Sequence, residues 1–202
     1  VMMRETAGIQ TSIDYESEED AMNKLRVSLA ISPIVTAMFA NSPIRNGKNT
    51  GYKSYRASSW LKTDNDRCGL ISRKIFEEEF SFDDYAQYLL DVHMFFIERN
   101  NKIINATHLT FREFLDNGLN GFKANIEDWE LHLSTVFPDV RIKNYIEIRN
   151  CDSQKTEMIL ALPALIKGIM YDKNALNHAW SLVKDFSWNE LEEMRHSVPK
   201  LG

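Results

Sequence analysis

The sequence predicts an α+β fold in which an antiparallel sheet packs against helices. Segments with strand alternation are mixed with segments of helical periodicity, but not in the strand–helix–strand order of a parallel sheet. Strand-like runs at 92–99 and 102–106 flank Asn100 and Asn101, a dipeptide typical of tight turns, so they are predicted to form a β-hairpin. A hairpin is an antiparallel unit.

The chain is predicted to open with a strand and a long helix. We expect the strand at 4–15, because apolar and polar residues alternate from residue 9 to residue 14. Ser17 precedes three acidic residues, which is typical of a helix N-cap and first turn. The helix is expected to run to about residue 39, with Pro33 kinking or dividing it.

The later elements follow from caps, periodicity and helix-breaking residues. Polar loops are predicted at 45–50 and 63–69. Helices are predicted at 81–90, 111–115, 126–137, 154–170, 174–186 and 188–196. Pro138 is expected to end the third of these helices, and the apolar character of the fourth predicts that it is buried.

Composition excludes several classes of protein. A length of 202 residues suits one large domain or two small ones, and the formal charge of −5 gives no support to nucleic-acid binding. No apolar run approaches the roughly 20 residues that a membrane span requires, so no membrane partner is expected. Two cysteines form no disulfide framework, which favours a reducing compartment, and a cytoplasmic location is predicted.

One predicted strand, at 145–149, carries opposite charges on one face. Side chains alternate along a strand, so Glu147 and Arg149 point to one side and Ile146 and Ile148 to the other. A carboxylate suits a magnesium ion and an arginine suits phosphate oxygens, so the pair is compatible with a magnesium–nucleotide site. A solvated salt pair on an exposed sheet face is the alternative interpretation.

Four segments taken together resemble the glutamate–cysteine ligases of the bacterial and plant type. The segments are 2–10 (MMRETAGIQ), 39–43 (FANSP), 54–67 (SYRASSWLKTDNDR) and 145–152 (YIEIRNCD). The resemblance covers nearly the whole chain in the expected order. It implies a fold related to that of glutamine synthetase, in which a curved antiparallel sheet forms a funnel.

The resemblance also implies a reaction. ATP, with Mg²⁺, would phosphorylate the γ-carboxylate of glutamate, and the amine of cysteine would displace phosphate from the acyl phosphate, as in the first step of glutathione synthesis. ATP and Mg²⁺ are therefore the expected cofactors, and glutamate and cysteine the expected substrates. The protein's task in such chemistry is positioning and charge neutralisation.

Site residues are carried over from the matched segments. Glu147 stands where the family has a magnesium-binding carboxylate, and Arg149 where it has a catalytic arginine against the nucleotide phosphates. Gln10 stands at an inward strand position that contacts metal or ATP, and Ser12 on the same face would line the substrate pocket.

Three further residues are expected to contact substrate. Arg56 matches the arginine that clamps the α-carboxylate of glutamate, a role that suits its fork of donors. Trp60, about one helical turn later, would form a pocket wall, and Arg67 is a weaker phosphate or substrate candidate.

The chain departs from the family pattern in ways that limit these expectations. No Glu-x-Glu strand precedes Thr6, so residues 1–202 are expected to be the C-terminal half of the catalytic domain and inactive without the N-terminal half. Phe95 stands where some relatives have an aromatic side chain whose hydroxyl contacts substrate, so that contact is not expected here. Ala106 stands where plant enzymes have one cysteine of a regulatory disulfide, so redox control by that disulfide is not expected. Two alternatives stay open: a ligase that uses another amine, and a truncated, non-catalytic homologue that acts as a binding module.

Overall fold

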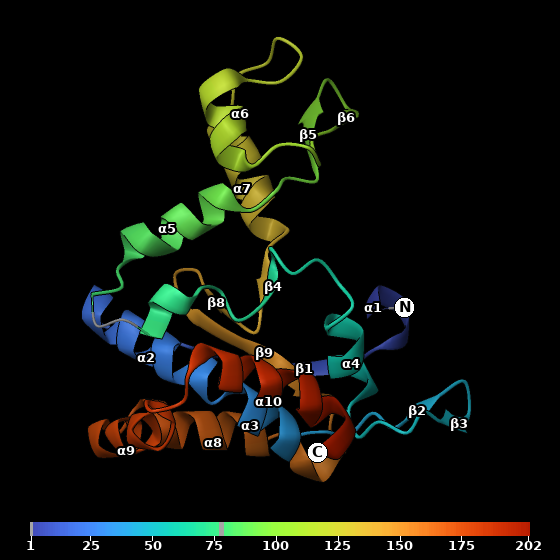
Figure 1. Cartoon of the computed structure of the whole chain (residues 1–202), viewed down its shortest axis with the longest axis vertical. Coiled ribbons are helices and arrows are strands. Elements are labelled where there is room, and N and C mark those ends of the chain that lie inside the picture. Colours follow the sequence, from blue (N-terminus) through green and yellow to red (C-terminus); the bar gives the residue numbers. More distant parts are fainter. Residues whose placement is uncertain (1, 77–78) are drawn as a thin grey trace.

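The computed structural model describes residues 2–76 and 79–202 and confirms a mixed helix–strand fold with an antiparallel main sheet (Figure 1). Strand β9 (Ile146–Asp152) lies at the centre of this sheet, between β1 (Gly8–Ile13) and β8 (Val140–Ile142). Both neighbours run antiparallel to it. Strands β1 and β9, whose first residues are 138 positions apart in the sequence, thus pair directly. The polar face of this sheet carries the site described below.

Helices make up most of the rest of the described chain. They are α1 (Met2–Glu5), α2 (Glu18–Ala30), α3 (Ser32–Met38), α4 (Tyr55–Trp60), α5 (Phe82–Asp91), α6 (Phe111–Asn117), α7 (Ile126–Ser134), α8 (Ala161–Met170), α9 (Lys173–Val183) and α10 (Trp188–Leu201), with 3-10 turns at Arg73–Phe76 and Thr156–Met158. Three strand pairs complete the fold: β2 (Ile44–Arg45) with β3 (Lys48–Asn49), β4 (Cys68–Gly69) with β7 (Phe137–Pro138), and β5 (Phe96–Arg99) with β6 (Lys102–Asn105). Of these pairs, only β4–β7 is parallel.

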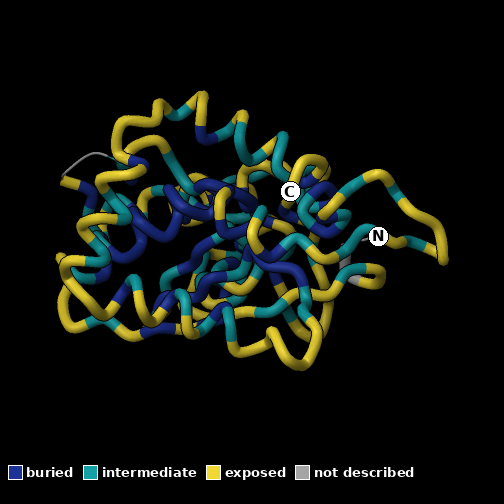
Figure 2. The backbone as a smooth tube through the Cα atoms, turned by 90° about the horizontal axis from the view of Figure 1, so that it is seen from below, coloured by how far each residue is buried: buried dark blue, intermediate teal, exposed yellow. Residues whose placement is uncertain are grey.

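The main core lies between the sheet and the helices that pack on its apolar face. Ile146 and Ile148 are fully or almost fully buried there, together with Leu25 and Leu29 of α2. Ser17 caps α2 by accepting a hydrogen bond from the backbone N–H of Asp20, as predicted. Pro33 lies in the first turn of α3, so the predicted division of the long helix is confirmed. Figure 2 shows that the buried residues lie in the interior and the exposed residues around it.

A second, smaller core is formed by the β5–β6 hairpin with α6 and α7, at the upper end of Figure 1. Asn100 and Asn101 both have positive φ angles, 51° and 57°, as the predicted hairpin turn requires. The guanidinium of Arg99 forms two hydrogen bonds with the carboxylate of Asp128, at 2.6 and 2.5 Å, which join the hairpin to α7. None of the helices in the described ranges has the length and apolarity needed to cross a bilayer.

Several predicted boundaries are wrong at the ends of elements. The first strand begins at Gly8, and Met2–Glu5 instead form a helical turn because Met, Arg and Glu favour helix. The predicted loop at 45–50 is a hairpin: Asn46 and Gly47 have φ angles of 50° and 72°, the conformation that an Asn-Gly turn adopts.

Three predicted helices are shorter than expected, and the one at 174–186 ends at Val183. The helix at 126–137 ends at Ser134, because Phe137 and Pro138 pair with β4, part of the predicted loop at 63–69. The helix at 154–170 begins only at Ala161. Pro163 lacks an N–H and is tolerated in a first turn, whereas a helix begun at 154 would place it in the interior.

Lowering the pH is expected to destabilise the second core through His132. This histidine is 3% exposed, its Nε2 lies 2.8 Å from the carbonyl oxygen of Leu89, and its Nδ1 has no hydrogen-bond partner among the described residues. Burial lowers the pKa of His132 below its usual value. The unfolded state therefore binds more protons just below pH 6.5, and the free energy of unfolding falls there by up to about 1.4 kcal/mol per pH unit.

The measurement is urea denaturation between pH 7.5 and 5. His132→Gln should reduce the decrease in the free energy of unfolding below pH 6.5. His178 is exposed and provides a control, because His178→Gln should leave that decrease unchanged. A profile of equal slope in wild type and His132→Gln would contradict the assignment.

Candidate functional site

The polar face of the main sheet carries a buried cluster of two arginines and one glutamate: Arg141, Glu147 and Arg149. Arg141 on β8 lies directly opposite Glu147 on β9, and Ser12 on β1 lies opposite it on the other side. Oε2 of Glu147 accepts hydrogen bonds from Nη2 and Nε of Arg141, at 2.8 and 3.1 Å, and from Nη1 of Arg149, at 2.6 Å. The predicted pairing of Glu147 with Arg149 on one strand face is confirmed.

The Glu147 carboxylate is held in its ionised form. Its side chain is only 11% exposed, and burial by itself would favour the neutral acid. The hydrogen bond from Arg149 and the charge and hydrogen bonds of Arg141 outweigh this, so the pKa of Glu147 is lowered. The cluster therefore contributes a net positive charge to this face at neutral pH.

A β-bulge in β9 lies at Arg149. Between the pairs Ile9–Cys151 and Thr11–Ile148, two residues of β9, Arg149 and Asn150, lie opposite the single residue Gln10. Asn150 turns toward α3, where its amide donates to the carbonyl oxygen of Ser32 at 2.7 Å. Arg149 remains on the polar face and reaches the cavity described next.

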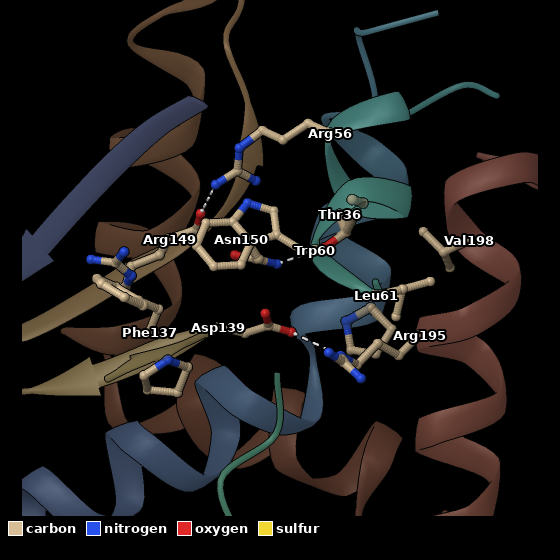
Figure 3. A pocket seen from close by; sticks show the side chains of 13 residues that line it. Thr36, Arg56, Trp60, Leu61, Phe137, Asp139, Arg149, Asn150, Arg195 and Val198 are labelled. Atoms are coloured by element: carbon tan, nitrogen blue, oxygen red, sulfur yellow. Dashed lines mark hydrogen bonds and ion pairs between the residues drawn. The ribbon is translucent and has the colours of Figure 1, made fainter. Parts of the chain in front are cut away.

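This cavity, of about 30 Å³, lies where β9 meets α3, α4 and α10 (Figure 3). Its polar lining consists of Thr36, Arg56, Trp60, Asp139, Arg149, Asn150 and Arg195. Its apolar lining includes Phe137, and the centre of the Phe137 ring lies 6.2 Å from the centre of the Trp60 ring. We call it the arginine cavity, because three of its four charged side chains are arginines.

Arg56 is packed tightly against the sheet. Its Nη2 donates to the backbone carbonyl oxygen of Arg149 at 2.7 Å, and its guanidinium lies 5.8 Å from the centre of the Trp60 ring. Gly8 permits this approach, since a Cβ at that position would lie 2.7 Å from Nε of Arg56. Burial lowers the pKa of Arg56, although Asp152 and Asp139 nearby favour its charged form.

The position of Arg56 is fixed by a buried aspartate at the end of β9. Asp152, 1% exposed, accepts hydrogen bonds from the hydroxyls of Ser42 and Ser54 at 2.7 and 2.9 Å, and from the backbone N–H of Asn41 at 2.8 Å. The Ser42 hydroxyl in turn accepts from the backbone N–H of Arg56, while Ser54 caps α4. One carboxylate thus anchors the beginning of the helix that carries Arg56 and Trp60.

The other predicted site residues lie at different places. Ser12 and Gln10 are exposed on the polar face, next to Glu147 and at the bulge respectively. Arg67 does not line the arginine cavity in the described chain. It is 2% exposed, donates to Asp64 at 2.6 Å and to the carbonyl oxygen of His93 at 2.7 Å, and lies 3.7 Å from the centre of the Phe95 ring. These contacts join Arg67 to the segment that precedes the β5–β6 hairpin.

Four residues of the site were missed in the sequence: Arg141, Asp139, Asp152 and Arg195. Arg141 lies between the apolar residues Val140 and Ile142, and this alternation was a readable strand signal. Asp152 lies in a matched segment, but the donors that surround it come from residues 41–54. No local pattern places Asp139 or Arg195 in a cavity with Arg56.

Glu147 is the side chain in this cluster that could bind a magnesium ion. Over residues 2–76 and 79–202, no group of three or more His, Cys, Asp or Glu side chains could hold a metal ion. The hydrogen bonds to Glu147 described in this range all end on Oε2, so Oε1 is the oxygen that could take a cation. Mg²⁺ prefers six oxygen ligands, so Glu147 would supply one of them and phosphate, water or other segments the rest.

An ionised carboxylate beside an arginine-lined cavity in an α+β fold is compatible with a protein that binds phosphate and carboxylate groups. Comparison with known proteins agrees. Residues 1–202 match the model of glutamate–cysteine ligase family 2 over the whole chain. Chloroplastic glutamate–cysteine ligases of Arabidopsis thaliana and Solanum lycopersicum are 42% and 41% identical to it, and ligase B of Oryza sativa subsp. japonica 41%, each over all of this chain. The chain belongs to the glutamate–cysteine ligase family 2.

The same comparison limits and corrects the sequence-based predictions. The chain spans only 39% to 41% of the length of these three relatives. The predicted cytoplasmic location is contradicted, because all three relatives are named as chloroplastic proteins. The error has a simple cause: a low cysteine count indicates a reducing environment, and that property does not identify one compartment.

Proposed function

We propose that this chain is part of a ligase that joins the γ-carboxylate of glutamate to the amine of cysteine, with ATP and Mg²⁺ as cofactors. One observation carries the proposal. Arg149 binds Glu147 with its side chain, lines the arginine cavity, and accepts a hydrogen bond from Arg56 on its backbone oxygen. It therefore joins the part of the site suited to a metal and phosphates to the part suited to a carboxylate.

Each group has a role in this proposal. A bound Mg²⁺ would neutralise phosphate charge, and Glu147 is the side chain that would hold it. Arg149, with Arg141 behind it, would stabilise the negative charge on the transferring phosphoryl group. Arg56 would bind the α-carboxylate of glutamate, and Trp60 would form one wall of the pocket.

The chemistry then needs little from the protein beyond position and charge. A γ-carboxylate oxygen of glutamate attacks the terminal phosphorus of ATP, and ADP leaves. The amine of cysteine attacks the resulting acyl phosphate at carbon, the C–O bond to phosphate breaks, and the amine loses one proton. Negative charge on the transferring phosphoryl group would develop beside Arg149, while Arg56 would hold the α-carboxylate, and guanidiniums that are already fixed in place cost no reorganisation.

Further parts of the proposal concern the whole protein. The three-stranded sheet would be one side of a glutamine synthetase-like funnel, and the chain would be the C-terminal half of the catalytic domain. The missing N-terminal half would supply more metal ligands, so this chain alone is expected to be inactive. Gln10 and Ser12 would face ATP or substrate from the exposed side of β1, and Arg67 is the weakest of the proposed contacts.

The direct test is to mix the protein in its natural length with ATP, Mg²⁺, glutamate and cysteine. Equal amounts of γ-glutamylcysteine, ADP and phosphate are the expected products. Product with another amine but not with cysteine would favour the alternative ligase. No ADP with any of several amines would favour a non-catalytic binding module and overturn the proposal.

Arg56→Ala is expected to raise the KM for glutamate by about 10- to 100-fold, because a charge-assisted hydrogen bond contributes about 1.5–3 kcal/mol. The KM for ATP should change much less, since Arg56 contacts no phosphate in this proposal. Steady-state kinetics with each substrate varied in turn measures both values. Equal, mild effects on the two constants would count against the assignment. Exposed Lys62 lies in the turn after α4 but outside the cavity, and Lys62→Ala is the control.

A further inference from the structure

The arginine cavity contains a third guanidinium that the proposed reaction does not use. Arg195 lies on α10, 139 residues after Arg56, and lines the same cavity (Figure 3). Its side chain is 11% exposed. A long cationic side chain that far from water requires compensating contacts.

The guanidinium of Arg195 is held in place by contacts with three residues: Glu192, Gly69 and Asp139. Nη1 donates to Glu192, one turn earlier on α10, at 3.2 Å. The guanidinium also packs on Gly69, where φ is +92° and a Cβ would lie 2.3 Å from Nη2. Nε lies 3.7 Å from Oδ2 of Asp139, close enough for attraction but beyond hydrogen-bond length. Most N–H donors of Arg195 are therefore not used in the hydrogen bonds described.

The helix that carries Arg195 is hydrogen-bonded to the start of the helix that carries Arg56. The carbonyl oxygen of Pro199 on α10 accepts hydrogen bonds from the backbone N–H groups of Lys53 and Ser54, both at 2.9 Å. Ser54 is the N-cap of α4. The ends of α10 and α4 are thus joined, so Arg195 and Arg56 keep a fixed relation across the cavity.

The lining favours a carboxylate over a phosphate. The cavity volume of about 30 Å³ leaves room for a group of the size of a carboxylate. Burial raises the pKa of Asp139, although Arg195 and Arg56 nearby favour its charged form, and a carboxylate at this place disfavours a dianionic ligand more than a monoanionic one. Nε1 of Trp60 is buried without a hydrogen-bond partner among the described residues, and it is a donor suited to an anionic oxygen.

We propose that Arg195 binds the carboxylate of an amino-acid substrate and determines which amino acids the cavity accepts. The inference rests on the proposed ligase function. The carboxylate belongs either to glutamate or to cysteine, which share this chemistry, and the two sources are separated by experiment. Gly69 and Asp139 act as positioning residues, since they hold the guanidinium and leave its donors directed at the substrate.

The experiment uses Arg195→Gln and Arg195→Lys in the protein of natural length. Two acceptors are compared: cysteine and cysteamine, which is cysteine without its carboxylate. If Arg195 holds cysteine, Arg195→Gln raises the KM for cysteine about 10- to 100-fold and leaves that for cysteamine unchanged. If it holds glutamate, the KM for glutamate rises by the same factor with either acceptor. In both cases kcat and the KM for ATP stay within about twofold, and Arg195→Lys recovers part of the loss.

Controls separate a binding role from a structural one. Lys200→Gln removes one positive charge from the same helix at an exposed position and should change none of these constants. The inference is overturned if Arg195→Gln leaves both amino-acid KM values within twofold of wild type, or if it changes kcat and all KM values together. A wild-type protein without ligase activity would overturn the proposed function; calorimetric binding of glutamate and cysteine, unaffected by Arg195→Gln, would then overturn this inference as well.

Discussion

Glu147→Gln is expected to lower kcat by about 100- to 1,000-fold, the range seen when a single group that stabilises transition-state charge is removed. The substitution keeps the shape of the side chain and one acceptor for the hydrogen bonds of Arg141 and Arg149. It removes the negative charge that would hold Mg²⁺. The loss should therefore appear in turnover and in metal dependence more than in folding.

The measurement is kcat at saturating substrates, with a magnesium titration at fixed ATP. Glu147→Gln should need more Mg²⁺ for half-maximal activity than wild type. Glu98→Gln makes the same exchange at an exposed position of the β5–β6 hairpin and should behave as wild type. A kcat within threefold of wild type, with an unchanged magnesium requirement, would remove Glu147 from the metal site.

The sequence was sufficient to predict the site where the signal is local. Alternation placed Glu147 and Arg149 on one face of a strand, because side-chain direction depends only on position along the strand. The Ser17 cap and the Asn100–Asn101 turn were equally local, and the structure confirms both. Arg56 and Trp60 were suggested by the family resemblance and not by a local signal, and they line one cavity with Arg149.

The rest of the site depends on contacts between distant segments. The bulge at Arg149 exists only in the register of β9 against β1, and neither strand alone shows it. Arg195 reaches the cavity because Gly69 and Asp139 make room for it, at positions 126 and 56 residues away. Arg67 lies outside the arginine cavity for the same reason: its donors bind Asp64 and the backbone oxygens of Thr135 and His93, which come from distant parts of the sequence.

Asp152→Ala is expected to lower the free energy of unfolding by about 3–5 kcal/mol, the range for removing one partner of a buried charged pair or network. The carboxylate accepts three hydrogen bonds, and its loss leaves the hydroxyls of Ser42 and Ser54 without an acceptor in the interior. The hydroxyl of Ser42 also accepts a hydrogen bond from the backbone N–H of Arg56, so the first turn of α4 should become less well ordered when Asp152 is lost. The KM for glutamate should then rise even where the variant remains folded.

Urea denaturation measures the stability, and kinetics well below the midpoint of unfolding measures the second effect. Asp152→Asn keeps the size and part of the acceptor capacity, so it should fold better than Asp152→Ala while retaining a raised KM for glutamate. Asp185→Asn is the matched control, since it makes the same exchange at an exposed position. If Asp152→Asn lost stability but kept the wild-type KM, the network would support the fold alone, and the position of Arg56 would have to be fixed by its contacts with Gly8 and the Arg149 carbonyl oxygen.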